Sequence, residues 1–488
     1  MVYILKDYEP KLALKYFEDI SAIPRGSYNE AAVAQFVASR AKALGLYHRV
    51  DARNNVVVKK PASAGCEGLP AVLFQAHLDM VCEKNGDTEH DFTKDGLVLQ
   101  LDGDILTAKG TTLGADDGKG VAYMLALMDS DSDAFPHPPL EFLFTTGEEV
   151  GFWGAMDFDP FDITARRLIG LDAGPEDTIW TTSAGAQEVT VSCPTEFVPT
   201  EGAGVLHIAV RGLQGGHSAM RITDELGNAN KIMGRILHNV EKEVYFRICK
   251  ITGGLMFNAI PREADAWIAI EAVDEDVVRQ IVLDVTDDIK AELHASDPGL
   301  VVIVEDSEAK QMMSASATKT VVDTIYNMPN GVRMMSKEIE GLPVTSTNMG
   351  VVKTLEDKVT VNTMLRSSSR TCSDDYIDNM VSIAKLCGMT DVEYGAWLSA
   401  WPYMKDSKLR EMTQRMYAER HNGERMKEMA GHGGLELGVF SEKIPGLDIV
   451  TLGCDHGDEH TVTEWMSISS FGRVYDFIKD MLVEMTKE

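Results

Sequence analysis

Histidine and carboxylate side chains follow four short apolar runs of the sequence, at the point where each run ends. His77 follows 71–74, Glu148 and Glu149 follow 140–144, Asp172 follows 168–171, and His456 and His460 follow 448–452. A further carboxylate, Asp116, stands in the glycine-flanked segment LGADDGKG. In α/β proteins, ligands bind beyond the carboxyl ends of the strands. If the four runs are strands of one sheet, these side chains gather at one edge of it.

Such a gathering suits a pair of divalent metal ions. Carboxylates and imidazoles crowded together repel one another or lose hydration unless a cation compensates them. Two histidines and three carboxylates fit zinc first, with manganese and cobalt as alternatives, and the absence of cysteine argues against a structural zinc. One carboxylate can bridge two ions about 3.5–4 Å apart, and such a pair activates a water and polarises a carbonyl group. The candidate ligands are His77, Asp116 and Asp172, with one of Glu148 and Glu149 and one of His456 and His460.

A two-metal hydrolase also uses a general base outside the metal shell. Glu148 and Glu149 are adjacent, and on an extended segment adjacent side chains point in opposite directions. We therefore expect one of them to bind a metal and the other to take a proton from the attacking water. The adjacent pair Glu148 and Glu149 can supply one residue for each role.

Each of these motifs also has an ordinary structural interpretation. A pair such as His77 and Asp79 is common at surfaces as a local hydrogen bond. Glu148 and Glu149 would be favourable charges at the start of a following helix. Asp172 could begin a turn. The prediction of a metal centre therefore depends on the combination of motifs and on the fold that brings them together.

The fold that we predict is α/β. The four apolar runs are apolar on both faces, which is typical of buried strands in a sheet. Helices are expected at 11–20, 29–44, 118–127, 408–422 and 469–485. The parts at the two ends of the chain would form one mixed-sheet domain, 1–186 and 401–488, and 187–400 would be an inserted α+β domain.

The inserted domain has the β-α-β-β-α-β order of a ferredoxin-like fold. Its predicted elements are strands at 205–210, 245–251, 264–271 and 301–305, and helices at 229–242 and 274–294. A second, less regular set follows, with helices at 318–327 and 374–386, two strands within 350–365 and one at 392–394. This order predicts a weak internal duplication. The tryptophan-rich AWLSAW at 396–401 would lead back to the first domain.

Composition excludes several functions. The net charge is −30, with 46 Lys+Arg against 76 Asp+Glu, which is unfavourable for binding nucleic acid or anionic membranes. The 7 cysteines are odd in number and none has CxxC spacing, which favours a reducing compartment. The first residues lack the pattern of a signal peptide, and no apolar run reaches the ~20 residues of a membrane span. We expect a cytoplasmic protein, and the sequence leaves a homodimer open.

The motifs resemble those of the two-zinc exopeptidase superfamily, which includes aminoacylases, glutamate carboxypeptidases and tripeptidases. Within it they resemble the aminoacyl-histidine (Xaa-His) dipeptidases, the peptidase D family. The resemblance covers nearly the whole chain. It rests on QAHLDMV, TLGADDGKG, TGEEVGFWGA, LDAG, RGLQGGHSAMRI, NAIPREA, TSTNMG and GHGGLELG.

This resemblance implies a metallopeptidase catalytic domain that is interrupted by a lid domain. His77 and Asp172 would hold one metal, Glu149 and His460 the other, and Asp116 would bridge them. Asp79 would orient the His77 imidazole. Glu148 would act first as general base and then as general acid.

The resemblance also implies substrate-binding residues in the lid domain. His217 would donate a hydrogen bond to the carbonyl oxyanion. Asn258 and Arg366 would bind the substrate, with Arg366 holding its terminal carboxylate through two hydrogen bonds. His432 matches another position on the substrate side. The implied activity is hydrolysis of unblocked dipeptides, including Xaa-His (carnosine-like) peptides, with broad specificity.

The sequence departs from the family pattern at its late histidine motif. The family has His-Ser-Pro-Asp-Glu, whereas this chain has HTVTE at 460–464. Counting from Asp448 places His460 in register as the ligand, with His456 as the alternative. Asp117, Lys119 and the AGA turn at 184–186 are also atypical, which bears on substrate preference.

Two other classes of function remain open. The same site could serve an aminoacylase, a carboxypeptidase or a tripeptidase. The chain could instead be a peptide-binding relative without metal or catalysis. The complete set of five predicted ligands and the presence of Glu148 favour an enzyme.

Overall fold

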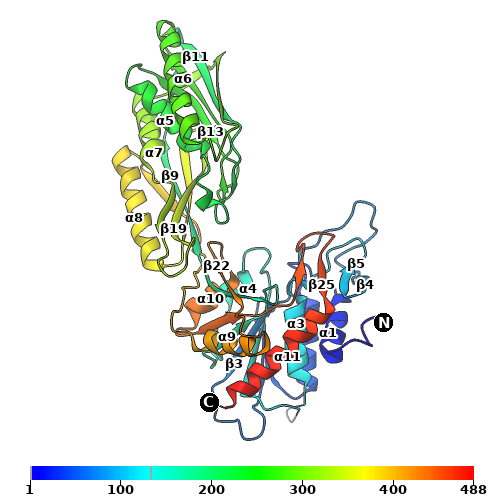
Figure 1. The fold of residues 1–488 in the computed structure, drawn as a ribbon. Coiled ribbons are helices and arrows are strands. Elements are labelled where there is room, and N and C mark those ends of the chain that lie inside the picture. Colours follow the sequence, from blue (N-terminus) through cyan, green and yellow to red (C-terminus); the bar gives the residue numbers. More distant parts are fainter. Residues whose placement is uncertain (1–2, 132–133, 488) are drawn as a thin grey trace. The chain divides into compact units, whose positions relative to one another are not determined.

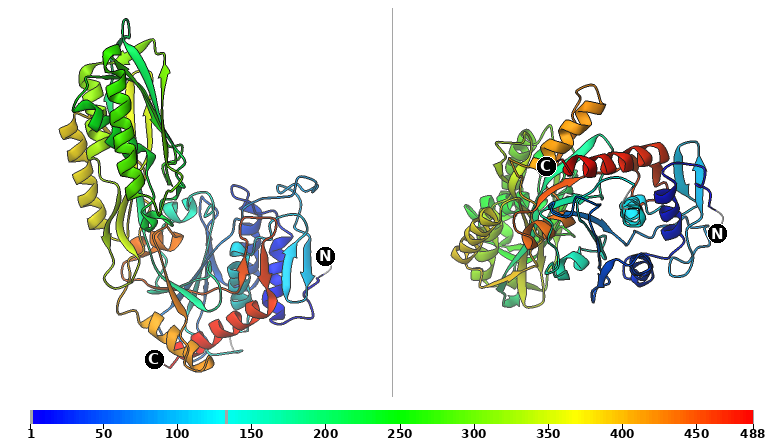
Figure 2. Two further views of the ribbon diagram at one scale, coloured as in Figure 1. Left: turned by 45° about the horizontal axis from the view of Figure 1, so that its top comes forward. Right: turned by 90° about the horizontal axis from the view of Figure 1, so that it is seen from below.

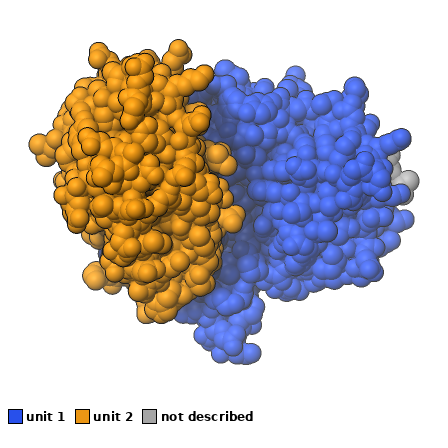
Figure 3. Space-filling model, turned by 90° about the horizontal axis from the view of Figure 1, so that it is seen from above, with its two compact units in different colours: residues 1–182, 403–430, 436–488 blue, residues 183–402, 431–435 orange. Residues whose placement is uncertain are grey.

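The computed structural model describes residues 3–131 and 134–487. The chain divides into two compact units, which Figure 3 shows in two colours. Unit 1 comprises residues 1–182, 403–430 and 436–488, and unit 2 comprises residues 183–402 and 431–435. The domain limits 1–186, 187–400 and 401–488 remain our proposal for the domain organisation.

Unit 1 is built on a six-stranded mixed sheet. Its strands, in spatial order, are β1 (Tyr47–Val50), β2 (Val56–Lys60), β6 (Leu140–Thr145), β3 (Val72–His77), β7 (Arg167–Gly170) and β23 (Asp448–Thr451). The four strands β6, β3, β7 and β23 run parallel, and β1 and β2 are antiparallel to their neighbours. These four parallel strands are the apolar runs of the sequence, which confirms the predicted α/β fold.

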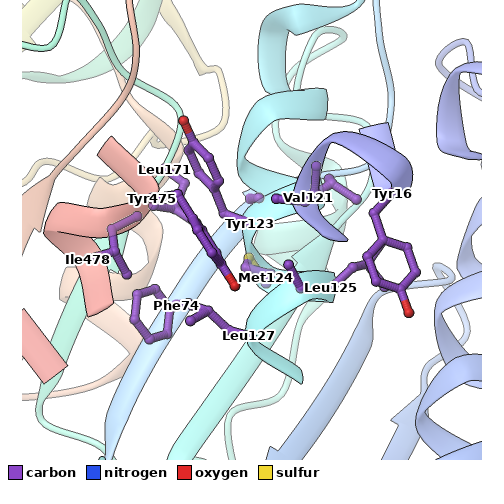
Figure 4. Packing of buried hydrophobic residues seen from close by; sticks show 14 of the residues in the cluster. Tyr16, Phe74, Val121, Tyr123, Met124, Leu125, Leu127, Leu171, Tyr475 and Ile478 are labelled. Carbon is purple, nitrogen blue, oxygen red and sulfur yellow. The ribbon is translucent and has the colours of Figure 1, made fainter. Parts of the chain in front are cut away.

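The helices of unit 1 enclose this sheet. They are α1 (Lys11–Ser21), α2 (Ala31–Ala43), α3 (Ala115–Asp129), α4 (Trp153–Asp157), α9 (Lys408–Arg420), α10 (Glu436–Lys443) and α11 (Ile468–Met485). Helices α1, α3 and α11 pack against one another (Figure 2): the ring of Phe471 lies 6.4 Å from that of Phe17 and 4.4 Å from that of Tyr123. Phe74 of β3, Tyr123 and Ile478 belong to the same buried core (Figure 4).

A small second sheet in unit 1 carries the late histidines. Its order is β24 (His456–Gly457), β25 (Trp465–Ser467), β5 (Ile105–Ala108) and β4 (Leu99–Asp102). The loop between β24 and β25 contains His460. Two further strands, β8 (Thr178–Ser183) and β22 (Lys427–Gly431), pair with each other. The loop with His460 therefore begins and ends in paired strands.

Unit 2 contains a nine-stranded antiparallel sheet (Figure 1). Its strands, in spatial order, are β16 (Val301–Ser307), β11 (Gly204–Arg211), β15 (Ala264–Ile270), β13 (Arg247–Gly253), β19 (Pro343–Thr354), β20 (Lys358–Ser367), β9 (Gly185–Pro194) and β21 (Asp391–Tyr394), and β18 (Gly331–Met335) pairs with β19. Its helices are α5 (Ala229–Glu241), α6 (Glu275–Glu292), α7 (Ala315–Asn327) and α8 (Arg370–Cys387). Short elements complete it: β10 (Phe197–Pro199) with β17 (Gln311–Met313), β12 (Gly216–His217) with β14 (Ala259–Ile260), η1 (Ile222–Asp224) and η2 (Ala272–Asp274).

The predicted internal duplication is confirmed by the strand order. One repeat is β11-α5-β13-β15-α6-β16, with spatial order β16-β11-β15-β13. The other is β9-α7-β19-β20-α8-β21, with the equivalent order β21-β9-β20-β19. The sequence prediction lacked the first strand of the second repeat, because β9 precedes the whole first repeat in the chain. The returning segment pairs beside the outgoing one, with Ala186 opposite Leu398 and Ser183 opposite Trp401.

Two local features differ from the predictions. Strand β3 continues to His77, which pairs with Thr145 of β6, so this histidine lies in the strand itself. Glu148 and Glu149 lie in a turn, closed by hydrogen bonds from the Gly151 and Phe152 amides to the Glu148 carbonyl, so the expected extended segment is wrong. No helix in 3–131 or 134–487 is long and apolar enough to cross a bilayer.

Candidate metal centre

The parallel strands of unit 1 deliver the predicted ligands to one edge of the sheet. His77 ends β3, Glu148 and Glu149 follow β6 after Gly147, and Asp172 follows β7. Since β3 lies between β6 and β7, the three strand ends are neighbours. Sheet pairing thus brings together side chains that are about a hundred residues apart in sequence.

Asp116 lies between the two histidines. Its Oδ1 is 2.9 Å from His77 Nε2, and its Oδ2 is 3.2 Å from His460 Nε2. Although α3 is assigned from Ala115, Asp116 has non-helical dihedral angles (φ −80°, ψ 109°), and so does Asp117. The regular helix therefore begins at the predicted residue, Gly118, and Asp116 is free to face both imidazoles.

Two groups of candidate ligands share this carboxylate. One group is His77, Asp116 and Asp172, and the other is Asp116, Glu149 and His460. The Asp172 carboxylate is 3.9 Å from His77 Nε2, and the Glu149 carboxylate is 3.0 Å from His460 Nε2. Glu149 Oε1 is buried and has no hydrogen-bond partner among the described residues, as suits an oxygen that binds a cation. The donor set therefore fits two divalent ions.

The structure separates the two late histidines. His460 faces Asp116 and Glu149, whereas His456 lies 2.9 Å from Glu459 through Nε2 and 2.8 Å from the Cys454 carbonyl oxygen through Nδ1. Among the described residues, His456 belongs to none of the groups that could hold a metal. This geometry favours His460 as the ligand.

A third group of residues that could hold a metal ion contains His77, Glu148 and Glu149. Glu148 therefore lies beside two of the candidate ligands, His77 and Glu149. Burial raises the pKa of Glu148 to about 8, and the charges of Glu149 and Asp116 contribute in the same direction. A raised pKa makes a carboxylate a better proton acceptor.

Asp79 joins the loops of His77 and Glu148. Its carboxylate oxygens accept hydrogen bonds from the amides of Glu148 (3.1 Å) and Glu149 (3.3 Å). His77 Nδ1 lies 3.5 Å from Asp79 Oδ1 and 3.2 Å from the Asp79 carbonyl oxygen. Asp79 thus holds the turn after β6 and lies beside the His77 imidazole, which it was expected to orient.

Burial and close contacts between imidazoles and carboxylates shift several pKa values at this centre. Hydrogen bonds to Asp116 and Glu149 raise the pKa of His460 to about 10. Burial opposes protonation of His77, but hydrogen bonds to Asp116 and Asp79 still raise its pKa. Burial and the charge of Asp116 raise the pKa of Asp172.

The other predicted substrate residues lie in unit 2, around Arg366 on β20. The guanidinium Nε is 3.5 Å from Ser218 Oγ, and the Ser218 amide donates to the Asn258 carbonyl oxygen (2.9 Å). Arg366 is 6% exposed, and no carboxylate in the described part of the chain forms an ion pair with it. Burial lowers the pKa of Arg366 to about 10, so it remains a cation at pH 7.

Besides burial, the positive charge of Arg366 lowers the pKa of two histidines of unit 2, His217 and His432. The amide of Ala219 donates to His217 Nδ1 (3.2 Å), which leaves the proton of the neutral ring on Nε2. Burial and the Arg366 charge lower the pKa of His217 and that of His432, the latter to about 4. His432 Nε2 is hydrogen-bonded to Ser346 Oγ (2.7 Å). The structure therefore gathers His217, Asn258, Arg366 and His432 within one unit.

Comparison with known proteins gives the family. The profile of peptidase family M20/M25/M40 matches residues 73–484. The chain belongs to this family. A cytosol non-specific dipeptidase from Escherichia coli (strain K12) is 33% identical to this M20 peptidase over 484 residues, 99% of each chain. The predicted resemblance, and with it an enzyme that acts on peptide bonds, is confirmed.

Solved structures agree with the M20 fold. An aminoacylhistidine dipeptidase from Vibrio alginolyticus superposes with a TM-score of 0.92 at 33% identity, over 98% of this chain and 97% of that one. An aminopeptidase from Bacillus cereus has a TM-score of 0.57 at 16% identity, over 99% of this chain and 100% of that one, and shares the fold.

Two buried residues beside the centre of this M20 peptidase, Glu436 and Lys119, had no supporting role in the sequence-based prediction. Glu436 accepts hydrogen bonds from Gln75 (2.6 Å) and Thr145 (2.8 Å), which lie on the two strands that end at His77 and before Glu148. Lys119 Nζ is fully buried, 3.4 Å from Asp117 and 3.9 Å from Asp172. Glu436 stands in the quoted motif GHGGLELG, but its partners are revealed only by the fold.

Proposed function

We propose that this chain is a metal-dependent dipeptidase that hydrolyses unblocked dipeptides, Xaa-His peptides included, with broad specificity. The observation that carries the proposal is the Asp116 carboxylate shared by two groups of candidate ligands. The dipeptidase names of the two relatives that match along the whole chain support the substrate class.

The proposed ligands are His77 and Asp172 for one ion, Glu149 and His460 for the other, and Asp116 for both. Zinc is the ion that we propose, with manganese and cobalt as alternatives. When bound, the two ions would supply Lewis acidity that polarises the peptide carbonyl and makes a water easier to deprotonate. Glu148 accepts the proton of that water at its carboxylate and then donates it to the leaving amine.

Unit 2 supplies the substrate contacts as the proposed lid domain. Arg366 is a buried cation without a carboxylate partner among the described residues, so an anionic substrate group would compensate it. The terminal carboxylate of a dipeptide has this charge and the planar shape that a guanidinium binds through two hydrogen bonds. His217, neutral with its proton on Nε2, donates to the oxyanion. Asn258 and His432 complete the proposed contacts.

A substrate panel separates this proposal from its rivals. The panel holds carnosine, other Xaa-His and Xaa-Xaa dipeptides, N-acetylated amino acids, tripeptides and dipeptide amides, each with metal-depleted and metal-replenished protein. A dipeptidase hydrolyses the free dipeptides only when metal is present. Preferred hydrolysis of acetylated amino acids or tripeptides would favour an aminoacylase or tripeptidase, and absence of all hydrolysis would favour a peptide-binding relative.

The proposal also includes location and partners. A cytoplasmic location agrees with the cysteine usage and with the cytosolic name of the Escherichia coli relative. Small peptides are the proposed partners. Whether the chain forms a homodimer is tested by measuring its molecular mass in solution.

A further inference from the structure

The loop that presents Asp116 is held from one side by a buried arginine. Arg25 is 2% exposed, and its Nη1 donates to the carbonyl oxygens of Leu78 (3.0 Å) and Asp79 (2.9 Å). Its Nη2 donates to the carbonyl oxygen of Gly114. One guanidinium therefore connects the segment after His77 with the segment before Asp116.

A buried carboxylate holds the same loop from its amide side. Glu464 is 2% exposed, and its Oε2 accepts hydrogen bonds from the amides of Leu113 (2.8 Å) and Gly114 (2.9 Å). Its Oε1 accepts from the amide of Asp116 itself (3.2 Å). Because Glu464 lies four residues after His460, it connects the Asp116 loop with the loop of that histidine.

The loop is shaped to admit the arginine. Gly114 has a φ of +66°, and a Cβ added there would lie 2.5 Å from Arg25 Nη2. A Cβ at Gly118 would lie 2.7 Å from the same atom. Glycine at 114 is therefore required by the backbone conformation and by the close approach of the guanidinium.

We propose that Arg25 and Glu464 are positioning residues of the metal centre, which fix Asp116 so that one oxygen faces His77 and the other faces His460. They neither touch the substrate nor bind metal. Their effect is on the affinity for the two ions, because a carboxylate that serves two ions must keep both oxygens in place before the ions arrive. Loss of a group that orients a metal ligand typically weakens metal affinity about 10–100-fold.

The alternative is that Arg25 and Glu464 only stabilise the fold and have no effect on metal binding. Arg410 provides a matched control, because it is also a buried arginine of unit 1 that binds backbone carbonyls. It is 4% exposed and donates to the carbonyl oxygens of Met404 (2.9 Å) and Lys405 (2.9 Å). The partners of Arg410 lie beside no candidate ligand in the sequence, whereas those of Arg25 lie beside His77 and Asp116.

The inference rests on the proposed metal centre, and the experiment compares Arg25→Lys, Glu464→Gln and Arg410→Lys with the unaltered chain. Each metal-free protein is titrated with zinc in a calorimeter, and its unfolding temperature is measured separately. We expect Arg25→Lys and Glu464→Gln to bind zinc about 10–100-fold more weakly. Arg410→Lys should bind zinc as tightly as the unaltered chain does, even if its unfolding temperature falls as far as that of the other two variants.

A second variant and a second readout keep the test decisive if Arg25→Lys does not fold. Glu464→Asp retains the charge and should lose less affinity than Glu464→Gln, whose side-chain amide cannot accept three N–H donors. The visible absorption of the cobalt-loaded protein should change in both Glu464 variants, because it reports ligand geometry. Unchanged zinc affinity and cobalt spectrum in Glu464→Gln would overturn the inference. Failure of the unaltered chain to bind two ions would instead overturn the proposed function.

Discussion

Asp116 presents one carboxylate oxygen to His77 and the other to His460, with 2.9 Å from Oδ1 to the first imidazole and 3.2 Å from Oδ2 to the second. His77 ends a central strand, and His460 lies in a loop of the small sheet. The relationship joins two parts of the chain that are 383 residues apart in numbering and makes Asp116 the centre of the proposed site.

Arg366→Met should weaken the binding of dipeptides with a free carboxyl terminus. A charge-assisted hydrogen bond contributes about 1.5–3 kcal/mol, so we expect KM to rise about 10–150-fold. Hydrolysis of the corresponding dipeptide amides should change little. The control is Arg370→Met, an exposed arginine paired with Asp374. Equal losses for free and amidated dipeptides would mean that Arg366 does not bind the terminal carboxylate.

His217→Ala should reduce turnover more than substrate binding. If the Nε2 proton stabilises developing charge, kcat falls about 10²–10³-fold. His207→Ala is the control, because His207 also lies in unit 2 but is paired with Asp265 (2.7 Å). A raised KM with unchanged kcat would assign His217 to binding alone.

Mixing chains tests whether each chain uses its own unit 2. Because the duplication gives one chain both repeats, we expect a mixture of His217→Ala and Glu148→Gln chains to remain inactive. Activity recovered on mixing would show that sites are shared between subunits.

Metal affinity should rise with pH. In the metal-free chain, the pKa of His460 is raised to about 10, so His460 is protonated at pH 7, and the pKa of His77 is raised in the same direction. Metal binding requires neutral imidazole and must displace these protons. Below the raised pKa, affinity should gain about tenfold per pH unit for each proton displaced. Calorimetry in buffers of different ionisation enthalpy counts the protons, and proton uptake or no exchange would contradict the assignment.

Much of the centre was predictable because strand ends leave a clear signal in the sequence. His77, Glu149 and Asp172 each follow an apolar run, and parallel pairing gathers such positions. The turn at Glu148 was not predicted, although Gly147, with a φ of +64°, precedes it. The segment between the strand and the next helix is too short for its hydrophobic pattern to distinguish a turn from an extended segment.

Other features left little signal. Arg25 binds backbone carbonyl oxygens, which every residue carries, so its partners cannot be inferred from residue types. Glu464 was visible at the end of the late histidine motif, but its three amide partners come from a loop about 350 residues earlier in the sequence. Strand β9 completes the second repeat of unit 2 from before the first, an order that local patterns do not reveal.

Glu148→Gln should separate catalysis from metal binding. The amide keeps the shape of the side chain but cannot accept the proton, so turnover should fall at least ~10²-fold with both ions retained. Glu149→Gln should instead weaken the binding of one ion, and its activity should recover partly in excess metal. If Glu148→Gln is the variant that loses metal, the two roles are reversed.

The number of ions bound per chain tests the central claim most directly. Elemental analysis and calorimetric titration of metal-replenished protein should give about two divalent ions per chain. Asp116→Asn should weaken the binding of both ions together, because the Asp116 carboxylate belongs to both ligand groups. Binding of one ion or none by the correctly folded chain, or loss of a single ion in Asp116→Asn, would contradict the account.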